Sequence, residues 1–156
     1  MARKQILIGA LAATALAIAG TGVAVATTTS PQHGNDFTVV EHAVTDTTVD
    51  IGPKGDSLGD VLAFGNPVYD AGNHTQVGND QGSCVRTKVG ASWECNWTTI
   101  LPGGSLAVEG PFYDSGDSVL AITGGTGKWA GARGQMTLHA RDAAGSSYDF
   151  RFSIIN

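Results

Sequence analysis

The chain has 156 residues, which suits a single domain, and its 14 acidic and 9 basic residues give a formal charge of −5. The basic residues form no cluster, so the composition excludes nucleic acid and anionic membrane surfaces as partners. A neutral, apolar ligand is compatible with this charge.

The first 26 residues differ in composition from the rest of the chain. Arg3 and Lys4 precede an apolar run rich in alanine and glycine, and Ala24-Val25-Ala26 forms a small-x-small cleavage site. This pattern predicts a secretory signal peptide over residues 1–26, and hence an extracellular or periplasmic protein without membrane contact after cleavage. The alternative is an uncleaved anchor, because the apolar run is long enough to span a bilayer. Cleavage removes Arg3 and Lys4 and moves the charge from −5 to −7.

A polar leader is predicted for residues 27–36 and one folded domain for residues 37–156. Within the domain, short β-rich runs alternate with turn residues, and no amphipathic helix longer than a turn or two is expected. This pattern is typical of an antiparallel sandwich or barrel of about eight strands. The strand-like runs, in chain order, are 37–44, 60–69, 82–88, 91–101, 105–112, 119–123, 135–141 and 148–155.

The first two runs contain polar residues at informative positions. Alternation along the first run puts Glu41 on the same face as Phe37 and Val39. A carboxylate on an apolar face is desolvated, which raises its pKa and suits it to proton transfer or to orienting a carbonyl. The alternative is that Glu41 points to solvent. In the second run, Asn66-Pro67 predicts a bulge or a strand end, because proline cannot donate a ladder hydrogen bond.

The two cysteines flank the hairpin predicted from the third and fourth runs. Counting outward from a tip at Val89-Gly90 places Cys84 opposite Cys95, at a separation that a disulfide can span. In an exported chain this arrangement predicts a disulfide bond, and the alternative is two buried free thiols.

Residues 121–135 form a stretch with five glycines in fifteen positions. Such a stretch between two strand-like runs predicts a tightly folded corner, which Trp129 can anchor in the core. Gly127-Lys128 lacks the earlier glycine and the following Ser or Thr of a phosphate-binding loop, so no nucleotide cofactor is expected. The four histidines have no metal-ligand spacing, so no metal site is expected either.

The glycine-rich stretch and several other motifs occur in the order of a known family. They are Leu120-Ala121-Ile122-Thr123-Gly124-Gly125-Thr126-Gly127 with Gly131-Ala132-Arg133-Gly134-Gln135, Gly65-Asn66-Pro67-Val68-Tyr69-Asp70, Val77-Gly78 with Gly82-Ser83-Cys84-Val85, and Val108-Glu109-Gly110-Pro111-Phe112. This set resembles the allene oxide cyclase barrel proteins, and the glycine stretch is equally similar to plant dirigent proteins, which share that barrel. The resemblance covers the chain from about Phe37 to its end.

The resemblance implies an all-β fold, an eight-stranded antiparallel barrel of the allene oxide cyclase and dirigent type. It also implies a secreted protein that binds a small hydrophobic molecule and catalyses its intramolecular cyclisation or isomerisation without a cofactor. The alternative is a dirigent-like or non-catalytic module that only holds the ligand, and a plain structural barrel without a pocket is a third reading. Because both families commonly form trimers, a homotrimer is implied as well.

Individual residues acquire roles from the same resemblance. Glu41 matches the glutamate that faces the cyclase cavity and is the candidate catalytic residue, although Ala43 replaces an asparagine that helps to hold a water there. Asn66 matches an asparagine of the cyclase cavity, with a turn residue before proline as the alternative. Cys84 matches a cavity cysteine, which has no thiol to offer if it is bridged to Cys95.

Substrate contacts are also expected from the second half of the chain. Arg133 matches the pocket arginine of dirigent proteins, with a solvated or ion-paired arginine as the alternative. The aspartate of dirigent proteins is replaced by Pro111-Phe112. Phe112 and Tyr113, with Trp93 and Trp97, are candidates to line an apolar cavity, and plain core packing is the alternative.

Overall fold

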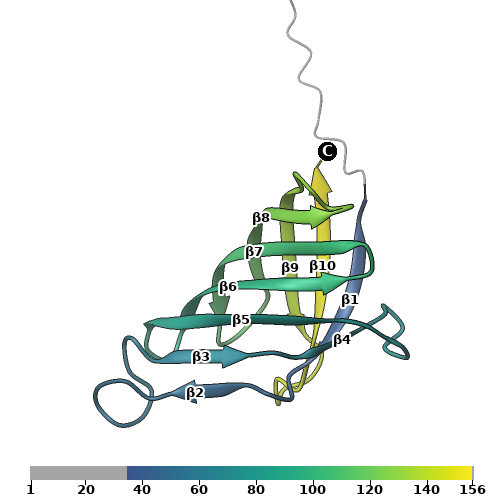
Figure 1. Ribbon diagram of the computed structural model, residues 1–156. Coiled ribbons are helices and arrows are strands. Elements are labelled where there is room, and N and C mark those ends of the chain that lie inside the picture. The colour runs from purple at the N-terminus through teal and green to yellow at the C-terminus, as the bar shows by residue number, and fades with distance from the viewer. Residues whose placement is uncertain (1–34, 156) are drawn as a thin grey trace, which may run out of the picture.

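Alternation of buried and exposed side chains runs through most strands of the computed structural model, which describes residues 35–155 (Figure 1). In β10 (Ser147–Ile155), for example, Phe150, Phe152 and Ile154 are buried while Arg151 and Ile155 are exposed. The predicted signal peptide and most of the predicted leader lie outside the described residues. The other strands are β1 (Phe37–His42), β2 (Thr47–Val49), β3 (Val61–Phe64), β4 (Pro67–Tyr69), β5 (Gln76–Lys88), β6 (Ser92–Leu101), β7 (Gly104–Tyr113), β8 (Ser118–Gly127) and β9 (Arg133–Ala140).

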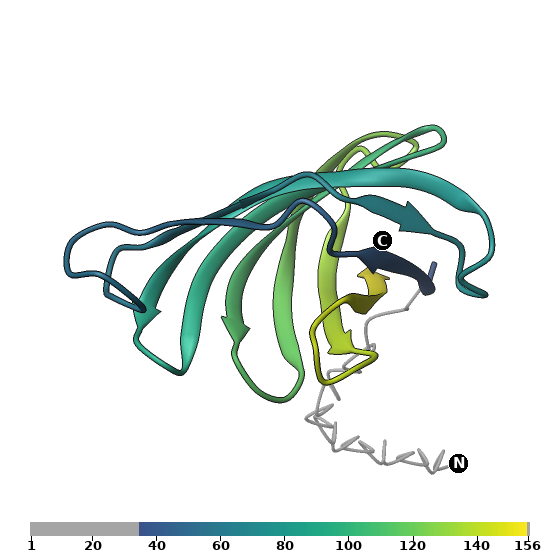
Figure 2. The same ribbon diagram turned by 90° about the horizontal axis from the view of Figure 1, so that it is seen from below.

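The strands close into an eight-stranded antiparallel barrel, as predicted. Since β3 and β4 both pair with the same side of β5, they act as one interrupted barrel strand. The ring then runs from β5 through β6, β7, β8, β9 and β10 to β1. It closes where β1 meets β4, through Val40 opposite Tyr69 and Glu41 opposite Val68. Figures 1 and 2 show the curved wall that results.

The interruption predicted at Asn66-Pro67 separates β3 from β4. Asn66 does not leave the wall there, because its backbone N–H donates to the Asp80 carbonyl at 3.0 Å and the Asp80 N–H donates back at 2.9 Å. The backbone at the break therefore stays hydrogen-bonded to β5, while the Asn66 side chain points towards Glu41.

Two elements extend further than the sequence predicted. Strand β5 begins at Gln76 and not at residue 82, so Asp80 belongs to a strand and not to a polar connection. Strand β8 continues to Gly127 and takes up part of the glycine-rich stretch. Glycine is needed there, because a Cβ at Gly125 would lie 2.5 Å from the Trp129 carbonyl oxygen and 2.6 Å from that of Ser105. The corner itself is the short turn 128–132.

The predicted disulfide joins Cys84 of β5 to Cys95 of β6, which are direct partners with Cα atoms 4.0 Å apart. A bulge beyond Arg86 pairs Lys88 with Ser92, one residue away from the predicted partner Ala91. Both cysteines are buried, and the bond is compatible with an oxidising compartment.

Stacked aromatic rings fill the end of the barrel where β10 ends, which we call the plugged end. The ring of Phe37 stacks between Trp129 and Phe152, with centroid distances of 5.1 and 4.9 Å. The glycine corner thus anchors its tryptophan in the core, as expected. The opposite end carries the turns 141–146 and 114–117 and receives the end of β1.

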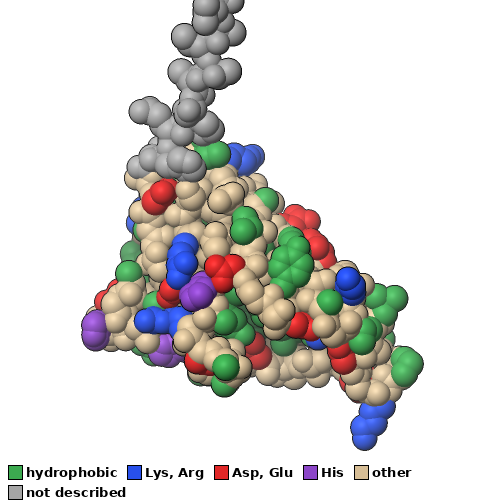
Figure 3. All heavy atoms as spheres, turned by 180° about the vertical axis from the view of Figure 1, so that it is seen from behind, with side chains coloured by type: hydrophobic (Ala, Val, Ile, Leu, Met, Phe, Trp, Pro, Cys, Tyr) green, Lys and Arg blue, Asp and Glu red, His purple; other side chains and the backbone are tan. Residues whose placement is uncertain are grey.

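Strand β2 and the loop 50–60 form a flap that projects from the wall beside β3 (Figure 2). Hydrophobic side chains gather at the flap end of the molecule in Figure 3. Exposed apolar residues of the flap include Val49, Ile51 and Leu58. The described part of the chain contains no helix long and apolar enough to cross a membrane.

Candidate functional site

A small cavity of about 40 Å³ lies inside the barrel, on the side of Glu41. Its wall combines two carboxyl groups with aliphatic and aromatic side chains and the disulfide. The lining residues are Glu41, Asp46, Leu62, Phe64, Cys84, Cys95, Trp97, Phe112, Leu138, Tyr148 and Phe150. A volume of this size holds a few water molecules at most.

A second hollow of about 240 Å³ lies next to the cavity, between the turns 114–117 and 141–146. The two spaces share Phe112, Leu138 and Tyr148 as lining residues. The rings of Phe112 and Tyr148 meet edge to face, with centroids 6.1 Å apart. This ring pair is therefore part of the partition between the inner cavity and the outer hollow.

Glu41 faces the barrel interior and is only 5% exposed. Its Oε1 accepts a hydrogen bond from the Asn66 side-chain amide at 2.7 Å. The same amide group donates to Asp46 Oδ1, also at 2.7 Å. The break between β3 and β4 thus directs Asn66 to link the end of β1 to the segment that follows it.

The other end of the Asn66 side chain is equally occupied. Its Oδ1 accepts from the backbone N–H groups of Val44 and Thr45, at 3.0 and 2.9 Å. With both its donors and its acceptor engaged, Asn66 is a rigid bracket for the Glu41 carboxyl group.

Asp80 completes a group of carboxyl side chains around this amide. It is 1% exposed, and its Oδ1 accepts from the Asn66 backbone N–H at 3.1 Å. Its Oδ2 is buried without a hydrogen-bond partner among the described residues, which leaves it available to a proton carried by Glu41.

Burial, with the nearby charge of Asp80, raises the pKa of Glu41 to about 9, and burial raises the pKa of Asp80 to about 7. Two carboxylates in contact in a dry site cannot both ionise, so the pair shares a proton at neutral pH. Glu41 is then an uncharged acid and can donate a hydrogen bond as well as accept one.

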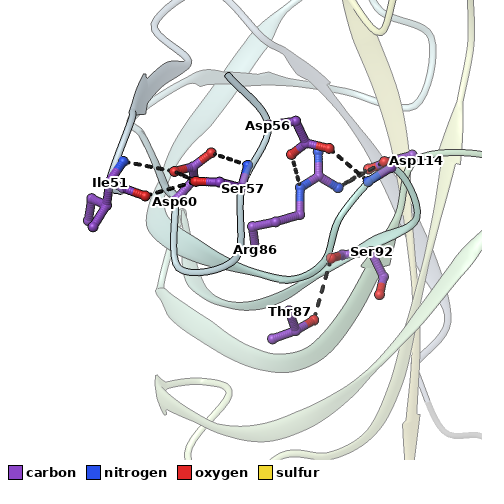
Figure 4. Close-up of polar contacts among 9 residues, drawn as sticks. Ile51, Asp56, Ser57, Asp60, Arg86, Thr87, Ser92 and Asp114 are labelled. Carbon is purple, nitrogen blue, oxygen red and sulfur yellow. Dashed lines mark hydrogen bonds and ion pairs between the residues drawn. The ribbon is translucent and has the colours of Figure 1, made fainter. Parts of the chain in front are cut away.

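Arg86 forms a separate cluster that holds the flap against the barrel (Figure 4). Its Nε lies 2.6 Å from Asp56 of the flap, and its Nη1 donates to both carboxylate oxygens of Asp114 at 2.7 and 2.8 Å. The guanidinium group also lies 3.9 Å from the centre of the Trp93 ring. Asp60, beside this cluster, accepts a hydrogen bond from the Ser57 backbone N–H, which holds the loop 50–60 in its conformation. The cluster braces the structure and leaves Arg86 no free donor face.

The structure brings some of the predicted site residues together and separates others. Glu41, Asn66, Phe112 and the disulfide lie at or next to the cavity. Tyr113, 45% exposed, lines only the outer hollow. Arg133 is exposed at the glycine corner and donates to the Ala132 carbonyl at 2.7 Å. It lines a different surface depression, with Trp129 and Ile155, at the plugged end of the barrel.

Three residues of the site were missed by the sequence analysis. Asp80 was hidden in a polar run, although counting back from Cys84 in steps of two would have placed it on the inner face. Tyr148 lies at the start of the last strand-like run, and alternation there marks it only as one of several apolar positions. No local sequence signal marks Asp46, which reaches the site only through Asn66.

Among residues 35–155 no group of three or more His, Cys, Asp or Glu side chains is arranged to hold a metal ion. The site itself combines a hydrogen-bonded carboxyl pair with an apolar wall.

Comparison with known proteins agrees with this fold. Residues 41–141 match the sequence profile of the family described as allene oxide cyclase. A pyocyanin demethylase is similar in structure, with 25% identity and a TM-score of 0.65 over 74% of this chain and 98% of that one.

Two further structures share the fold at lower identity. A pterocarpan synthase dirigent protein is 16% identical, with a TM-score of 0.69 over 82% of this chain and 98% of that one. An exo-specific intermolecular Diels-Alderase is 12% identical, with a TM-score of 0.62 over 79% of this chain and all of that one.

Proposed function

Because the chain belongs to the allene oxide cyclase family, we propose that it binds a small hydrophobic molecule inside the barrel and catalyses an intramolecular cyclisation or isomerisation of that molecule without a cofactor. One observation carries the proposal: a buried Glu41 that retains its proton at neutral pH lies in the wall of an otherwise largely apolar cavity.

The reaction class fits the groups present. An intramolecular rearrangement keeps every atom of the substrate and needs no co-reactant, so the barrel contributes mainly by holding one folded conformation of a flexible molecule against its apolar wall. The neutral Glu41 donates a hydrogen bond to the substrate oxygen on which negative charge develops, and it keeps or recovers its proton when the new bond has formed. Asn66 and Asp80 hold the carboxyl group in place.

Access to the cavity requires a side-chain movement. Ligand pockets usually measure about 300–1,000 Å³, whereas the inner cavity measures about 40 Å³. Displacement of the Phe112 and Tyr148 rings joins it to the outer hollow of about 240 Å³. We therefore expect the ligand to enter between the turns 114–117 and 141–146.

A second candidate function is ligand binding without chemistry, as in a dirigent-like module. Ala43 favours this candidate, because it replaces the asparagine with which the family's glutamate holds a water. The similarity to a dirigent protein is compatible with it.

The test begins with native mass spectrometry of the protein from its own source, to detect a small molecule that co-purifies with it. The identified compound is then incubated with ligand-free protein and followed by chromatography at constant mass, since an isomer changes its retention and not its mass. The variants are Glu41→Gln and, as a matched control, Glu109→Gln on the exposed face of β7.

Conversion by the native protein and by Glu109→Gln, with loss in Glu41→Gln, supports the proposal. Binding without conversion selects the non-catalytic module. Full conversion by Glu41→Gln removes the glutamate from the mechanism, and failure to bind any small molecule overturns both candidates.

A further inference from the structure

The walls of the cavity and of the outer hollow carry charge of one sign only. Their acidic residues are Glu41, Asp46, Asp114 and Asp142, and no lysine, arginine or histidine lines either space. A ligand that passes through the hollow into the barrel meets carboxyl groups along its whole path.

The charge at the outer hollow is fixed. Asp142 accepts hydrogen bonds from the Ser146 hydroxyl at 2.6 Å and from the backbone N–H groups of Ala144 and Ser146, which hold the pKa of its carboxyl group at about 2. Burial and the charges of Glu41, Asp46 and Asp142 raise the pKa of Tyr148, so the phenol at the partition is uncharged.

The nearest positive charge is not available to a ligand. Arg86 is 8% exposed, contacts Asp56 and Asp114 in ion pairs, and packs its guanidinium face on Trp93. In the turn 141–146, the Nε of Arg141 lies 3.6 Å from the Asp149 carboxylate. His42, next to Glu41 in β1, is held by Asn73 at 2.7 Å and stacks on Tyr69.

A hydrogen-bond donor, by contrast, is present without a partner among the described residues. The indole of Trp97 lines the cavity, is 5% exposed, and has an Nε1–H with no acceptor there. The proton shared by Glu41 and Asp80 is already held between the two carboxyl groups. Unpaired buried donors favour a ligand that brings an acceptor.

We propose that the site selects an uncharged hydrophobic molecule with an acceptor oxygen, such as a ketone, enone or ester, and rejects carboxylates. This inference rests on the proposed function, because it names the class of molecule that the barrel takes. Each ionised carboxylate near the path repels an anionic ligand, by about 1 kcal/mol at 4 Å even in water, so we expect about tenfold weaker binding of an anion.

The experiment compares decan-2-one with decanoate, which have the same chain length and differ in charge. Binding at pH 7 is measured by displacement of 1-aminoanthracene, which is uncharged at this pH, and independently by native mass spectrometry. The test variant is Asp46→Asn/Asp142→Asn, which keeps the acceptor oxygens used by Asn66 and by the backbone of the turn. The control is Glu94→Gln/Glu109→Gln, which makes the same change in net charge on the exposed outer faces of β6 and β7.

We expect the Kd of decanoate to be about tenfold higher than that of the ketone, both for the native protein and for the control. In the test variant, this ratio of Kd values should fall by about tenfold. Decanoate binding as tightly as the ketone overturns the inference and leaves ligand binding intact. An equal narrowing in the control assigns the preference to net charge and also overturns it. Binding of neither compound, by either readout, overturns the inference together with the proposed function.

Discussion

Glu41→Gln should be more stable than the native protein, and its advantage should grow as the pH rises. A folded-state pKa of about 9, against an ordinary value of 4.5, means that the folded protein keeps a proton which the unfolded chain has released. Stability from this group is therefore complete below pH 4.5 and is lost as the pH rises towards 9. Glutamine reproduces the neutral acid at every pH: its oxygen accepts from Asn66 and its amide donates to the unpaired Oδ2 of Asp80.

The size of the effect follows from proton linkage. One extra proton on the folded state changes the free energy of unfolding by about 1.4 kcal/mol per pH unit. Between pH 5 and pH 8 the native protein should thus lose up to about 4 kcal/mol relative to Glu41→Gln. For a domain of this size, 1 kcal/mol corresponds to about 4 °C in Tm, so the two melting curves should separate by several degrees per pH unit.

Thermal melts of the native protein, Glu41→Gln and the outward-facing Glu109→Gln control, measured from pH 5 to pH 8, provide the test. Titrating groups away from the site act equally in all three proteins, so the difference in Tm between the native protein and Glu41→Gln reports the coupled pair of Glu41 and Asp80. If the curves of the native protein and Glu41→Gln run parallel over this range, Glu41 is ionised throughout and the shared-proton interpretation is wrong.

Four further predictions concern the rest of the molecule. Replacing both Cys84 and Cys95 by alanine should lower the free energy of unfolding by about 3 kcal/mol, because the disulfide closes a loop between residues 11 positions apart. Denaturant titrations of the two proteins check this value. Arg86→Met should lower stability by about 1 kcal/mol, since it leaves the partly exposed carboxylates of Asp56 and Asp114 without their ion pair, and hydrogen exchange should show the loss first in the flap 50–60. Phe112→Ala should open the partition and tighten 1-aminoanthracene binding, with unchanged affinity arguing against access by this path. Light scattering at micromolar concentration should give the mass of three chains, and a one-chain mass across a dilution series would contradict the trimer expected from the family.

The antiparallel all-β architecture could be predicted because its information is local, whereas the choice of a barrel over a sandwich came from the resemblance to the family. Alternation in β1 and β10, turn residues between the runs, and the counting that paired Cys84 with Cys95 depend on neighbours in sequence. The side of β1 on which Glu41 lies followed from the same period of two. The loop at the tip is one residue longer than predicted, since Lys88 pairs with Ser92, and the bulge beyond Arg86 compensates for this residue and restores the predicted pairing of Cys84 with Cys95.

The site could be predicted only in part, because it depends on contacts across the barrel. Asp46 and Asp80 are 34 positions apart and meet only through Asn66. The motif that contains Arg133 is recognisable in sequence, yet Arg133 begins β9 opposite Ile155, at the end of the barrel away from Glu41. The cavity volume is set by how Phe112, Tyr148 and Trp97 pack, which no spacing rule describes.

The pairing of β1 with β10 has a practical consequence for any fusion or immobilised form of the protein. Phe37 is opposite Phe152, so the chain enters and leaves the barrel side by side (Figure 1). His42 and Ser147, at the other ends of these strands, lie towards the cavity. A tether attached at either end of the described chain therefore emerges at the plugged end and leaves the opening clear. A linker that joins the two ends needs only a few residues, so a circular permutant with new termini in the flap should fold.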